Sequence, residues 1–357
     1  MLGITPKQKE ILEYVEEDYK TNHFSPTLEE IAKKFKRSKP TIHQYIKTLI
    51  DKGRLQQNSS GARGIMPITQ SANLTEKRKF KIGIIGYGFV GQAVEYGFSN
   101  HEIHIYDKYK NFETLNEVVE KSDYIFVCLP TPIKEDESGI DLSIMDENID
   151  SLAKLTKGTD KIIIIKSTVV PGTTQGFIDK YPKSLFCFNP EFLREASFLQ
   201  DFVNTDRIII GATNDQVSRR VAAMYQAVLP LAPIFMTDPT TAEMVKYMAN
   251  CFLSTKVIFA NEMYEICEKL KIKYEEVKKM VVADKRILDG HLDITSLGGF
   301  GGKCFPKDLL ALRAMAKGKG VDTKILDAVW AKNLKVRKVK DWEEIPFAVS
   351  PAFGNKN

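Results

Sequence analysis

The first fifty residues carry apolar positions at helical spacing, interrupted by recurring helix-start signals. Thr5-Pro6 has the character of an N-cap followed by the first helical position, which predicts a first helix. Thr27 to Glu30 form a capping box, so a short second helix is expected to begin there. Ser38, followed by Pro40, opens a third helix in the same way. Two short helices joined by a tight turn are typical of a helix-turn-helix.

The next segment, Arg54 to Ile68, predicts a two-stranded wing. Gly61 and Gly64 flank a polar tip that lies between apolar runs. Residues 1–69 are therefore expected to form a small winged helix-turn-helix domain. Residues 70–79 are polar and lack apolar periodicity, and we interpret them as a linker.

From residue 80 onward the pattern changes to short apolar runs that alternate with helical periods. This alternation predicts an α/β fold, with a doubly wound Rossmann-type parallel sheet over residues 80–237. The expected strands are Lys81–Ile85, Ile103–Tyr106, Tyr124–Cys128, Ile162–Ile165, Leu185–Phe188 and Ile208–Ile210.

A long helical pattern follows the sheet. Thr240 to Glu243 form another capping box, and the pattern continues to about Leu270 without a glycine or a proline after residue 243. We expect an all-α central domain over residues 238–335, followed by a tail, residues 336–357. A helix of about seven turns usually builds a core or a subunit interface, so this segment also predicts a homodimer.

Composition narrows the class of protein. The chain of 357 residues is 43% hydrophobic, and it lacks an apolar run of the ~18 residues that span a bilayer. Met1 to Glu10 is too polar for a signal peptide, so we expect a cytoplasmic protein without a membrane partner. Five cysteines are an odd number and include no Cys-x-x-Cys pair, which argues against a disulfide framework and against a metal site.

The net charge of +5 is concentrated at the amino end. Residues 1–69 hold twelve Lys and Arg against eight Asp and Glu, which accounts for +4 of that charge. This asymmetry favours an anionic partner for the amino-terminal domain.

A dinucleotide-binding fingerprint, Gly86-Tyr87-Gly88-Phe89-Val90-Gly91, lies between a predicted strand and a predicted helix. Gly86 permits the turn, Gly88 lets the backbone approach a pyrophosphate, and Gly91 allows the helix to pack on the strand. Asp107 ends the next strand, sixteen positions after Gly91. A carboxylate there would accept hydrogen bonds from the adenosine ribose and repel a 2′-phosphate, which favours NAD over NADP.

Four polar residues follow other predicted strands. Because ligands of such sheets gather at the carboxyl ends of the strands, we expect Thr131, Thr168, Glu191 and Glu195 to lie near one crevice. Each one alone is more simply explained as a capping hydroxyl or a solvated carboxylate. Their joint placement is what indicates a site.

A cysteine among glycines stands out near the carboxyl end. Cys304 follows Gly298-Gly299-Phe300-Gly301-Gly302, with Lys303 and Lys307 on either side and Asp308 close behind. Glycines let backbone amides approach sulfur and substrate, and either lysine would favour the thiolate, so this segment predicts a nucleophilic cysteine. The alternative is a tight turn with a buried, unreactive cysteine.

Residues 2–68 resemble the DNA-binding domain of LexA-type repressors, through an opening Thr-Pro, a Ser-Pro-Thr turn and a Gly-Ala-Arg-Gly wing. The resemblance implies DNA as a partner of residues 1–69, and a winged helix used for protein contact is the alternative. Phosphate contacts are implied for Lys36, Arg37, Lys47 and Arg63. Residues implied to meet the major groove are Ser38, Lys39, Thr41, Ile42, Gln44 and Tyr45.

Residues 80 to about 335 resemble the UDP-glucose/GDP-mannose dehydrogenase family, nearest its UDP-glucose 6-dehydrogenases. Six motifs occur in the family's order: the glycine fingerprint, Pro-Thr-Pro, Lys-Ser-Thr-Val-Val-Pro-Gly-Thr-Thr, Asn-Pro-Glu-Phe-Leu-Arg-Glu, Glu-Met-Val-Lys-Tyr-Met-Ala-Asn and Gly-Phe-Gly-Gly-Lys-Cys-Phe-Pro-Lys-Asp. The resemblance implies that the primary alcohol of a nucleotide sugar is oxidised to a carboxylate by two NAD and water. The sugar would remain bound to the cysteine between the steps.

The resemblance also implies roles for individual residues. Cys304 would be the nucleophile, and Lys246 and Asn250, four apart on one helix face, would stabilise the oxyanion. Thr168 and Asp308 would hold a proton-relaying water, and Glu191 would assist thioester hydrolysis. The implied cofactor residues are Gly86, Gly88, Phe89, Val90, Gly91, Asp107, Thr131, Thr168 and Glu195. The implied substrate residues are Glu191, Phe192, Leu193, Lys246, Asn250, Phe300, Gly301 and Arg286, the last reaching across a dimer interface.

The sequence departs from the family at its carboxyl end, where the second nucleotide-binding fold is not found. Two functions therefore stay open. One is an NAD-dependent UDP-glucose 6-dehydrogenase, which the intact catalytic set favours. The other is a DNA-binding transcriptional regulator whose dehydrogenase body senses NAD(H) or a nucleotide sugar. A separate protein that supplies the nucleotide-covering fold is a third arrangement.

Overall fold

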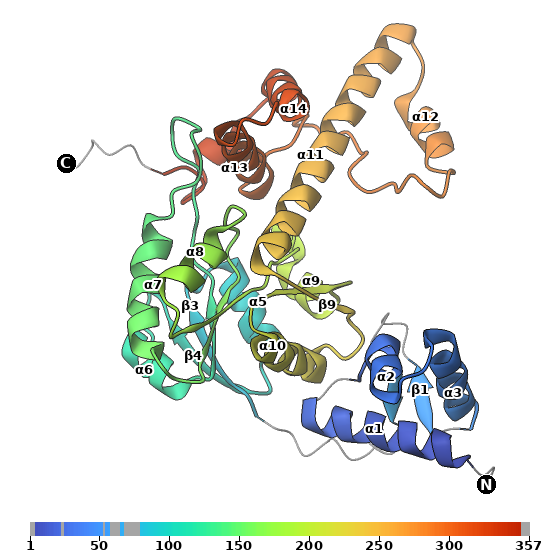
Figure 1. Cartoon of the computed structure of the whole chain (residues 1–357). Helices are drawn as coiled ribbons and strands as arrows, with labels where there is room; N and C mark the ends of the chain where they lie inside the picture. The colour runs from blue at the N-terminus through green and yellow to red at the C-terminus, as the bar shows by residue number, and fades with distance from the viewer. Residues whose placement is uncertain (1–3, 23–24, 53, 58–64, 68–78, 351–357) are drawn as a thin grey trace. The chain divides into compact units, whose positions relative to one another are not determined.

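The computed structural model describes residues 4–22, 25–52, 54–57, 65–67 and 79–350 (Figure 1). Chain contacts divide the molecule into two units. The first unit is formed by Met1–Cys128, Leu152–Lys166 and Thr174–Ala242, and the second unit is formed by Leu129–Ser151, Ser167–Thr173 and Glu243–Asn357. The loops that follow two strands of the sheet therefore belong with the helical second unit.

The amino-terminal part of the first unit is a winged helix-turn-helix. Its elements are α1 (Pro6–Asn22), α2 (Leu28–Phe35), α3 (Lys39–Asp51), β1 (Leu55–Gln57) and β2 (Ile65–Pro67). The predicted capping box is confirmed, because Thr27 Oγ1 accepts a hydrogen bond from Glu30 N at 3.1 Å and the Glu30 carboxylate accepts one from Thr27 N at 2.7 Å. β1 and β2 pair antiparallel, as expected for a wing. The predicted wing tip, Gly61 to Gly64, lies outside the described residues.

A seven-stranded sheet forms the rest of the first unit and confirms the predicted α/β class. Its strand order is β4-β3-β5-β6-β7-β8-β9. Strands β5, β6 and β8 are buried along their whole length, which explains their continuous apolar runs. The bounds are β3 (Lys81–Ile85), β4 (Glu102–Tyr106), β5 (Tyr124–Val127), β6 (Ile162–Ile165), β7 (Leu185–Phe188), β8 (Ile208–Gly211) and β9 (Ile234–Thr237).

The sheet differs from the predicted one at two places. β7 and β8 run antiparallel and share a single residue pair, Phe188 with Gly211, whereas the other neighbouring strands are parallel. The connection between them carries only a 3-10 turn, η2 (Glu195–Ser197), and the short helix α9 (Phe198–Val203). An apolar run identifies a strand but does not indicate its direction, and the short connection between β7 and β8 gives no further sign of it. β9 was not predicted, because its exposed and half-buried residues do not form a conspicuous apolar run.

Helices cover both faces of the sheet. α5 (Phe89–Gly97), α9 and α10 (Asp215–Val228) contribute to one apolar core with the strands, which includes Val94, Phe98, Phe202 and Tyr225. α6 (Leu115–Lys121) lies on the opposite side of β3 and β4 from α5 (Figure 1). Two further helices follow β5 and β6, namely α7 (Ser143–Thr156) and α8 (Thr173–Lys180).

The second unit is helical. Its elements are α11 (Pro239–Leu270), whose first turn belongs to the first unit, α12 (Tyr274–Val281), α13 (Cys304–Gly318), α14 (Lys324–Val336) and a 3-10 turn, η3 (Asp341–Glu343). Its core includes Tyr247, Phe300, Leu309, Trp330 and Trp342. Within the described ranges, every helix is too short or too polar to serve as a membrane span.

The predicted start of the long helix is wrong by a few residues. α11 begins at Pro239, and Asp238 supplies the cap, since its Oδ1 accepts a hydrogen bond from Thr241 N at 2.9 Å. Glu243, the expected end of the capping box, is fully buried and accepts a hydrogen bond from Gly172 N at 2.6 Å. Its carboxylate therefore ties the loop after β6 to α11 within the second unit.

Candidate active site

Cys304 begins α13 and is exposed, whereas Cys128, Cys187, Cys251 and Cys267 are buried. Burial raises the pKa of the Cys128, Cys187 and Cys251 thiols to about 12, which keeps them protonated. The alternative of a buried cysteine in a tight turn is therefore excluded for Cys304. A thiolate at the first turn of a helix is favoured by the helix dipole, so the position suits a nucleophile.

The glycine loop before Cys304 is held by side chains from three other segments. Gly299 N donates to Asn261 Oδ1 at 3.1 Å, Phe300 N to Asn333 Oδ1 at 2.8 Å and Gly302 N to Asp341 Oδ2 at 3.0 Å. These three amides were expected to face sulfur and substrate, and the structure instead uses them to fix the loop.

Packing explains why this loop needs glycines. A Cβ on Gly299 would lie 2.4 Å from Asn333 Oδ1, and one on Gly301 would lie 2.2 Å from Asp341 Oδ1. Gly299 also has a φ of +48°, in the left-handed region that side chains disfavour. The glycines therefore let Asn333 and Asp341 reach the backbone.

A buried polar network lies one turn into α13. Asp308 is 1% exposed, and its two oxygens accept hydrogen bonds from Asn250 Nδ2 and from Lys307 Nζ, each at 2.5 Å. Asn250 and Lys307 are buried as well. The ammonium of Lys307, which was expected to favour the Cys304 thiolate, is thus paired with Asp308.

The predicted pair on α11 is also buried. Lys246 is 2% exposed and Asn250 is 7% exposed, so neither side chain lies at the surface. Tyr247, the next residue, is completely buried, and burial together with the nearby Asp308 carboxylate raises the pKa of its hydroxyl well above 10. The surroundings of Asp308 are therefore dry, and hydrogen bonds to charged groups are strong in such an environment.

The loops after β5 and β6 contact each other in the second unit. Of the four residues that we expected near one crevice, two, Thr131 and Thr168, lie on these loops. Thr131 Oγ1 donates a hydrogen bond to Thr168 O at 2.8 Å, and Ser167 Oγ donates to Leu129 O at 2.7 Å. Thr131 and Thr168 are both buried. Glu191 and Glu195 belong to the first unit.

The fingerprint loop has the geometry of a dinucleotide cradle. α5 begins directly after Gly88, and a Cβ on Gly88 would meet no atom within 4 Å, so the glycine leaves open space for a ligand. A Cβ on Gly91 would lie 2.2 Å from Gly86 O, so this glycine is needed for helix packing. Phe89 and Val90 form the first turn of α5. The residues present fit a bound NAD pyrophosphate.

Asp107 lies at the end of β4 beside this loop. Its Oδ2 accepts a hydrogen bond from Tyr87 N at 2.8 Å and its Oδ1 accepts one from Tyr109 N at 2.9 Å. Asp107 thus fixes the fingerprint turn. The Tyr87 hydroxyl donates to the Glu95 carboxylate, which raises the pKa of Tyr87 to about 12.

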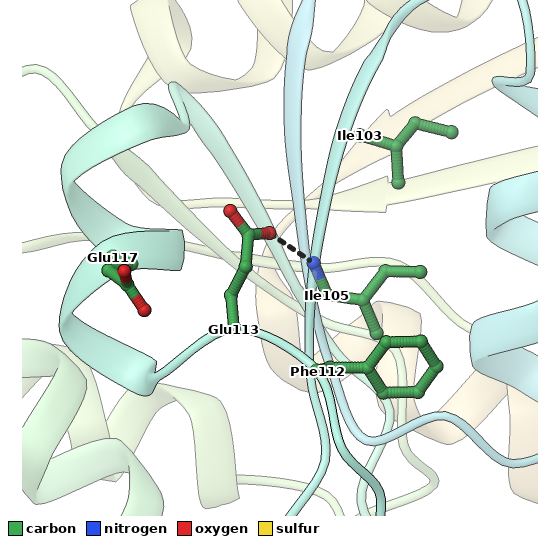
Figure 2. Close-up of a pocket in the computed structure, with 5 residues that line it drawn as sticks. All are labelled: Ile103, Ile105, Phe112, Glu113 and Glu117. Atoms are coloured by element: carbon green, nitrogen blue, oxygen red, sulfur yellow. Dashed lines mark hydrogen bonds between the residues drawn. The ribbon is translucent and has the colours of Figure 1, made fainter.

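A pocket of about 490 Å³ lies beside β4 and is lined by Ile103, Ile105, Phe112, Glu113 and Glu117 (Figure 2). Glu113 points its carboxylate back to the strand, where it accepts a hydrogen bond from Ile105 N at 3.2 Å. The Glu113 carboxylate also pairs with Lys121 at 2.8 Å and lies 3.0 Å from His104 Nδ1, so it already has partners.

The loop after β7 is anchored by a buried network that sequence reasoning missed. Asn189 Oδ1 accepts hydrogen bonds from Lys166 Nζ at 2.8 Å and from the Tyr225 hydroxyl at 2.5 Å, and its Nδ2 donates to Ile209 O at 2.7 Å. Glu191 follows two residues later, and its carboxylate accepts a hydrogen bond from Leu193 N at 2.7 Å. Lys166 and Asn189 are the first residues of two of the motifs that this chain shares with the family. Their place in these motifs was the sequence signal that could have identified them.

The neighbouring predicted residues are held on the same segment. The Phe192 ring packs against the Arg207 guanidinium at 3.9 Å. Glu195 begins η2, and the Arg194–Asp201 ion pair, at 2.6 Å, spans the turn. Together with Lys166 and Glu191, Phe192 and Arg207 line a cavity of about 30 Å³, large enough for a water molecule.

The remaining predicted residues lie at the surface or in the winged helix. Arg286 is exposed and pairs with Asp284 at 2.6 Å. Ser38, Lys39 and Gln44 are exposed at the start of α3, and Thr41 and Tyr45 are half-buried. Ile42, also expected to face DNA, is fully buried in the winged-helix core, so its side chain is not available for a base contact. Arg63 lies outside the described residues.

Comparison with known proteins identifies three matching regions of the chain. Residues 105–229 match the NAD binding domain of the UDP-glucose/GDP-mannose dehydrogenase family, and residues 240–335 match its central domain, together more than half of the chain. Residues 1–64 match the LexA DNA binding domain.

Individual relatives are similar over the same region. UDP-glucose 6-dehydrogenase of Rickettsia bellii is 39% identical over 226 residues, 61% of this chain and 50% of that protein. UDP-glucose 6-dehydrogenase TuaD of Bacillus subtilis is 35% identical over 226 residues, 61% of this chain and 48% of that protein. The structure of a UDP-glucose dehydrogenase from Pyrobaculum islandicum superposes with a TM-score of 0.66 at 29% identity, covering 73% of this chain and 69% of that one. The chain thus spans about half the length of these two curated relatives.

Proposed function

The chain belongs to the UDP-glucose/GDP-mannose dehydrogenase family, and we propose that it is an NAD-dependent nucleotide-sugar 6-dehydrogenase that converts UDP-glucose, two NAD and water to UDP-glucuronate. The observation that carries the proposal is the position of Cys304, exposed at the start of α13, one helical turn before the buried Asp308–Asn250 pair. This arrangement provides a nucleophile and a polar relay on one short segment.

The proposed reaction has two oxidation steps that each release one hydride, and NAD bound at the fingerprint loop would supply the hydride acceptor. The first removes a hydride and a proton from the sugar alcohol and leaves a C6 aldehyde. The Cys304 sulfur then forms a bond to that carbon, giving a thiohemiacetal, and loss of a second hydride and a proton gives a thioester. Water cleaves the carbon–sulfur bond, releases the carboxylate and returns the thiol. One covalent anchor serves both oxidations, since a free aldehyde would escape.

The family resemblance suggests the role of each neighbouring residue. Lys246 and Asn250 would stabilise the developing oxyanion, and their burial supports this role because donors act most strongly where water is excluded. Thr168 and Asp308 would hold the water that relays protons, and Glu191 would assist thioester hydrolysis. Thr131, Asp107, Glu195 and the fingerprint loop would bind NAD, whereas Phe192, Leu193, Phe300, Gly301 and Arg286 would bind the substrate.

We further propose that the enzyme is a homodimer through α11. Met248, Phe252 and Phe259 are 66%, 63% and 58% exposed, and their spacing of four and seven residues places them on one face of the helix. Met244, Ile266 and Leu270 extend the same exposed stripe. An apolar stripe of this length is typical of a protein–protein interface.

The proposal also includes a cytoplasmic location and domain boundaries at residues 69, 79, 237 and 335. Cys304 is exposed, and a reducing compartment would keep its thiol from forming a disulfide, which supports the location.

The test is an NADH-release assay with a panel of nucleotide sugars, performed on the full chain and on Cys304→Ser. The expected result is about two NADH per UDP-glucose for the native chain and no complete turnover for the variant. Absence of NADH with every nucleotide sugar in the panel, added alone or with a separately produced carboxy-terminal domain of a relative, would contradict the proposal.

A second function is favoured by the match of residues 1–64, namely DNA binding by the winged helix. The exposed Lys39 and Gln44 of α3 would meet the major groove. Fluorescence anisotropy with a DNA library should then give salt-dependent binding that Gln44→Ala weakens for selected sequences, with Lys317→Ala as a surface control. A regulator would bind DNA differently when NADH or UDP-glucose is present. Binding without sequence preference would contradict this second function.

A further inference from the structure

Arg337 and Asp341 hold the two ends of the glycine loop, residues 298–302, that precedes Cys304. Arg337 directly follows α14, and Asp341 begins η3. The match to the family's central domain ends at residue 335. Neither residue was singled out by the sequence pattern.

Arg337 holds the start of the loop. Its Nη1 donates a hydrogen bond to Gly298 O at 3.1 Å, its Nε donates to Val339 O at 3.0 Å, and its Nη2 pairs with Asp341 Oδ1 at 3.0 Å. The side chain is 7% exposed. A planar guanidinium can satisfy three acceptors in fixed directions, which the single ammonium of a lysine cannot do.

Asp341 holds the end of the loop. Its Oδ2 accepts a hydrogen bond from Gly302 N at 3.0 Å, two residues before Cys304. Its other oxygen accepts from Arg337, so the ion pair joins the two ends of the loop, Gly298 and Gly302, into one closed set of contacts. The next residue, Trp342, is buried against Trp330 at 5.5 Å and anchors this segment in the core.

We propose that Arg337 and Asp341 are positioning residues for Cys304, which keep its sulfur at the amino terminus of α13. Without the pair, Gly302 N loses its acceptor, the first turn of α13 frays and the sulfur leaves the helix terminus. The thiolate is then less favoured, and the thiol reacts more slowly. The role in turnover rests on the proposed function, whereas the role in thiol reactivity does not.

The primary test measures alkylation of Cys304 by iodoacetamide at pH 7 in the full chain, with the modified residue identified by mass spectrometry. The other four cysteines are buried, so the native protein reports on Cys304. Arg337→Lys and Asp341→Ala are expected to react about two- to fivefold more slowly than the native chain. An unchanged or faster rate in both variants would overturn the proposal.

Two controls separate positioning from general loss of structure. Arg313→Lys alters a partly buried arginine of α13, the helix that Cys304 begins. Arg313 pairs with Glu137 at 2.6 Å and does not contact the glycine loop, so Cys304 in this variant should be alkylated at the native rate. Asp341→Asn retains one oxygen for Gly302 N, so it should recover part of the rate lost in Asp341→Ala. If Arg313→Lys is slowed as much as Arg337→Lys, or if Asp341→Asn matches Asp341→Ala, the effect is not local and the proposal fails.

Steady-state NADH formation supplies the second readout. For Asp341→Ala the kcat should fall about fivefold or more, while the KM for NAD stays native because the fingerprint loop belongs to the other unit. If no variant or native chain forms NADH but alkylation follows the expected order, the proposed function fails and the positioning role stands.

Discussion

Asn333 and the backbone of Phe300 are hydrogen-bonded in both directions: Asn333 Oδ1 accepts from Phe300 N at 2.8 Å, and Asn333 Nδ2 donates to Phe300 O at 3.0 Å. Asn333 is fully buried and Phe300 nearly so. One side chain therefore satisfies both backbone polar groups of a buried residue in the loop before Cys304.

Asn333→Ala should accordingly lower the free energy of unfolding of the second unit. Two buried backbone groups lose their partner, at about 1–3 kcal/mol each. Urea unfolding followed by tryptophan fluorescence measures this unit, since both tryptophans of the chain, Trp330 and Trp342, lie in its core. Asn148→Ala is the control. Asn148 Nδ2 donates one hydrogen bond to Ile144 O at 2.8 Å within α7, so this substitution should lower the free energy of unfolding far less. Equal effects of the two substitutions would contradict the prediction.

Asp308→Asn should reduce both stability and activity, and a second substitution should separate the two. The variant leaves the buried Lys307 ammonium without its carboxylate, which destabilises by about 3–5 kcal/mol. Lys307→Met combined with Asp308→Asn removes the uncompensated charge and should recover most of the stability but no NADH formation. Recovery of NADH formation in the double variant would show that Asp308 acts only through the ion pair.

Gly88→Ala and Gly91→Ala should weaken NAD binding for different reasons. Gly88→Ala should fold normally, since its Cβ meets no atom within 4 Å, and should bind NAD at least about tenfold more weakly because the methyl group occupies the ligand's side of the turn. Gly91→Ala should also unfold at a lower temperature, because its Cβ lies 2.2 Å from Gly86 O. Calorimetric titration with NAD and thermal unfolding measure the two effects. Native NAD affinity in Gly88→Ala would argue against the cradle.

The Arg194–Asp201 pair predicts a specific dependence of stability on pH. Hydrogen bonds from the Arg194 guanidinium lower the pKa of Asp201 to about 2, below its ordinary value of 3.8. A lowered pKa in the folded state means that the pair stabilises fully above about pH 4 and that this contribution disappears as the pH falls to about 2. The difference in urea midpoint between the native chain and Asp201→Asn should therefore shrink over this range.

The effect should be modest, because Arg194 is largely exposed. Arg194→Gln is the matched variant. Asp201 still accepts hydrogen bonds from Arg194 N at 2.8 Å and from Ser197 Oγ at 3.0 Å in that variant, so Asp201→Asn should add only the smaller, remaining part of the effect. A difference that grows as the pH falls would have the wrong sign for this pair.

Phe252→Asp should convert the proposed dimer to a monomer. The substitution places a charge in the middle of the exposed stripe on α11, where an interface would bury it. Sedimentation at micromolar concentration measures the state, with Ile325→Asp, an equally exposed apolar position on α14, as the control. A native chain that sediments as a monomer at all concentrations would refute the dimer.

The sequence predicted most of the fold because local signals decide it. The capping box at Thr27 fixes the start of α2, and the apolar run of β6 is long enough to identify a buried strand. Direction and pairing are non-local, and for this reason the antiparallel placement of β8 was not predicted. The cap of α11 was misplaced because the expected end of its capping box, Glu243, accepts a hydrogen bond from Gly172, seventy-one positions away.

The residues of the candidate site that belong to a sequence motif could be predicted. Residues that matter only through their contacts in the folded structure could not. Cys304 and the glycine fingerprint are visible as patterns. Asn261 and Asn333, which hold the glycine loop, lie within helices, and the sequence around them gives no sign of their partners. The same limit explains why Ile42 was counted among groove-facing residues, although its helical position points it into the core.

The single residue pair between β7 and β8 divides the sheet along a seam. On one side, four strands share a continuous parallel register with β7, and on the other, β8 and β9 share a register of their own. Residues 190–201, which bridge the seam between the buried Asn189 and the core residue Phe202, belong to the strand register of neither side. The strand register therefore does not fix the segment that carries Glu191 and Phe192, whose position depends on side-chain contacts such as that of Phe192 with Arg207.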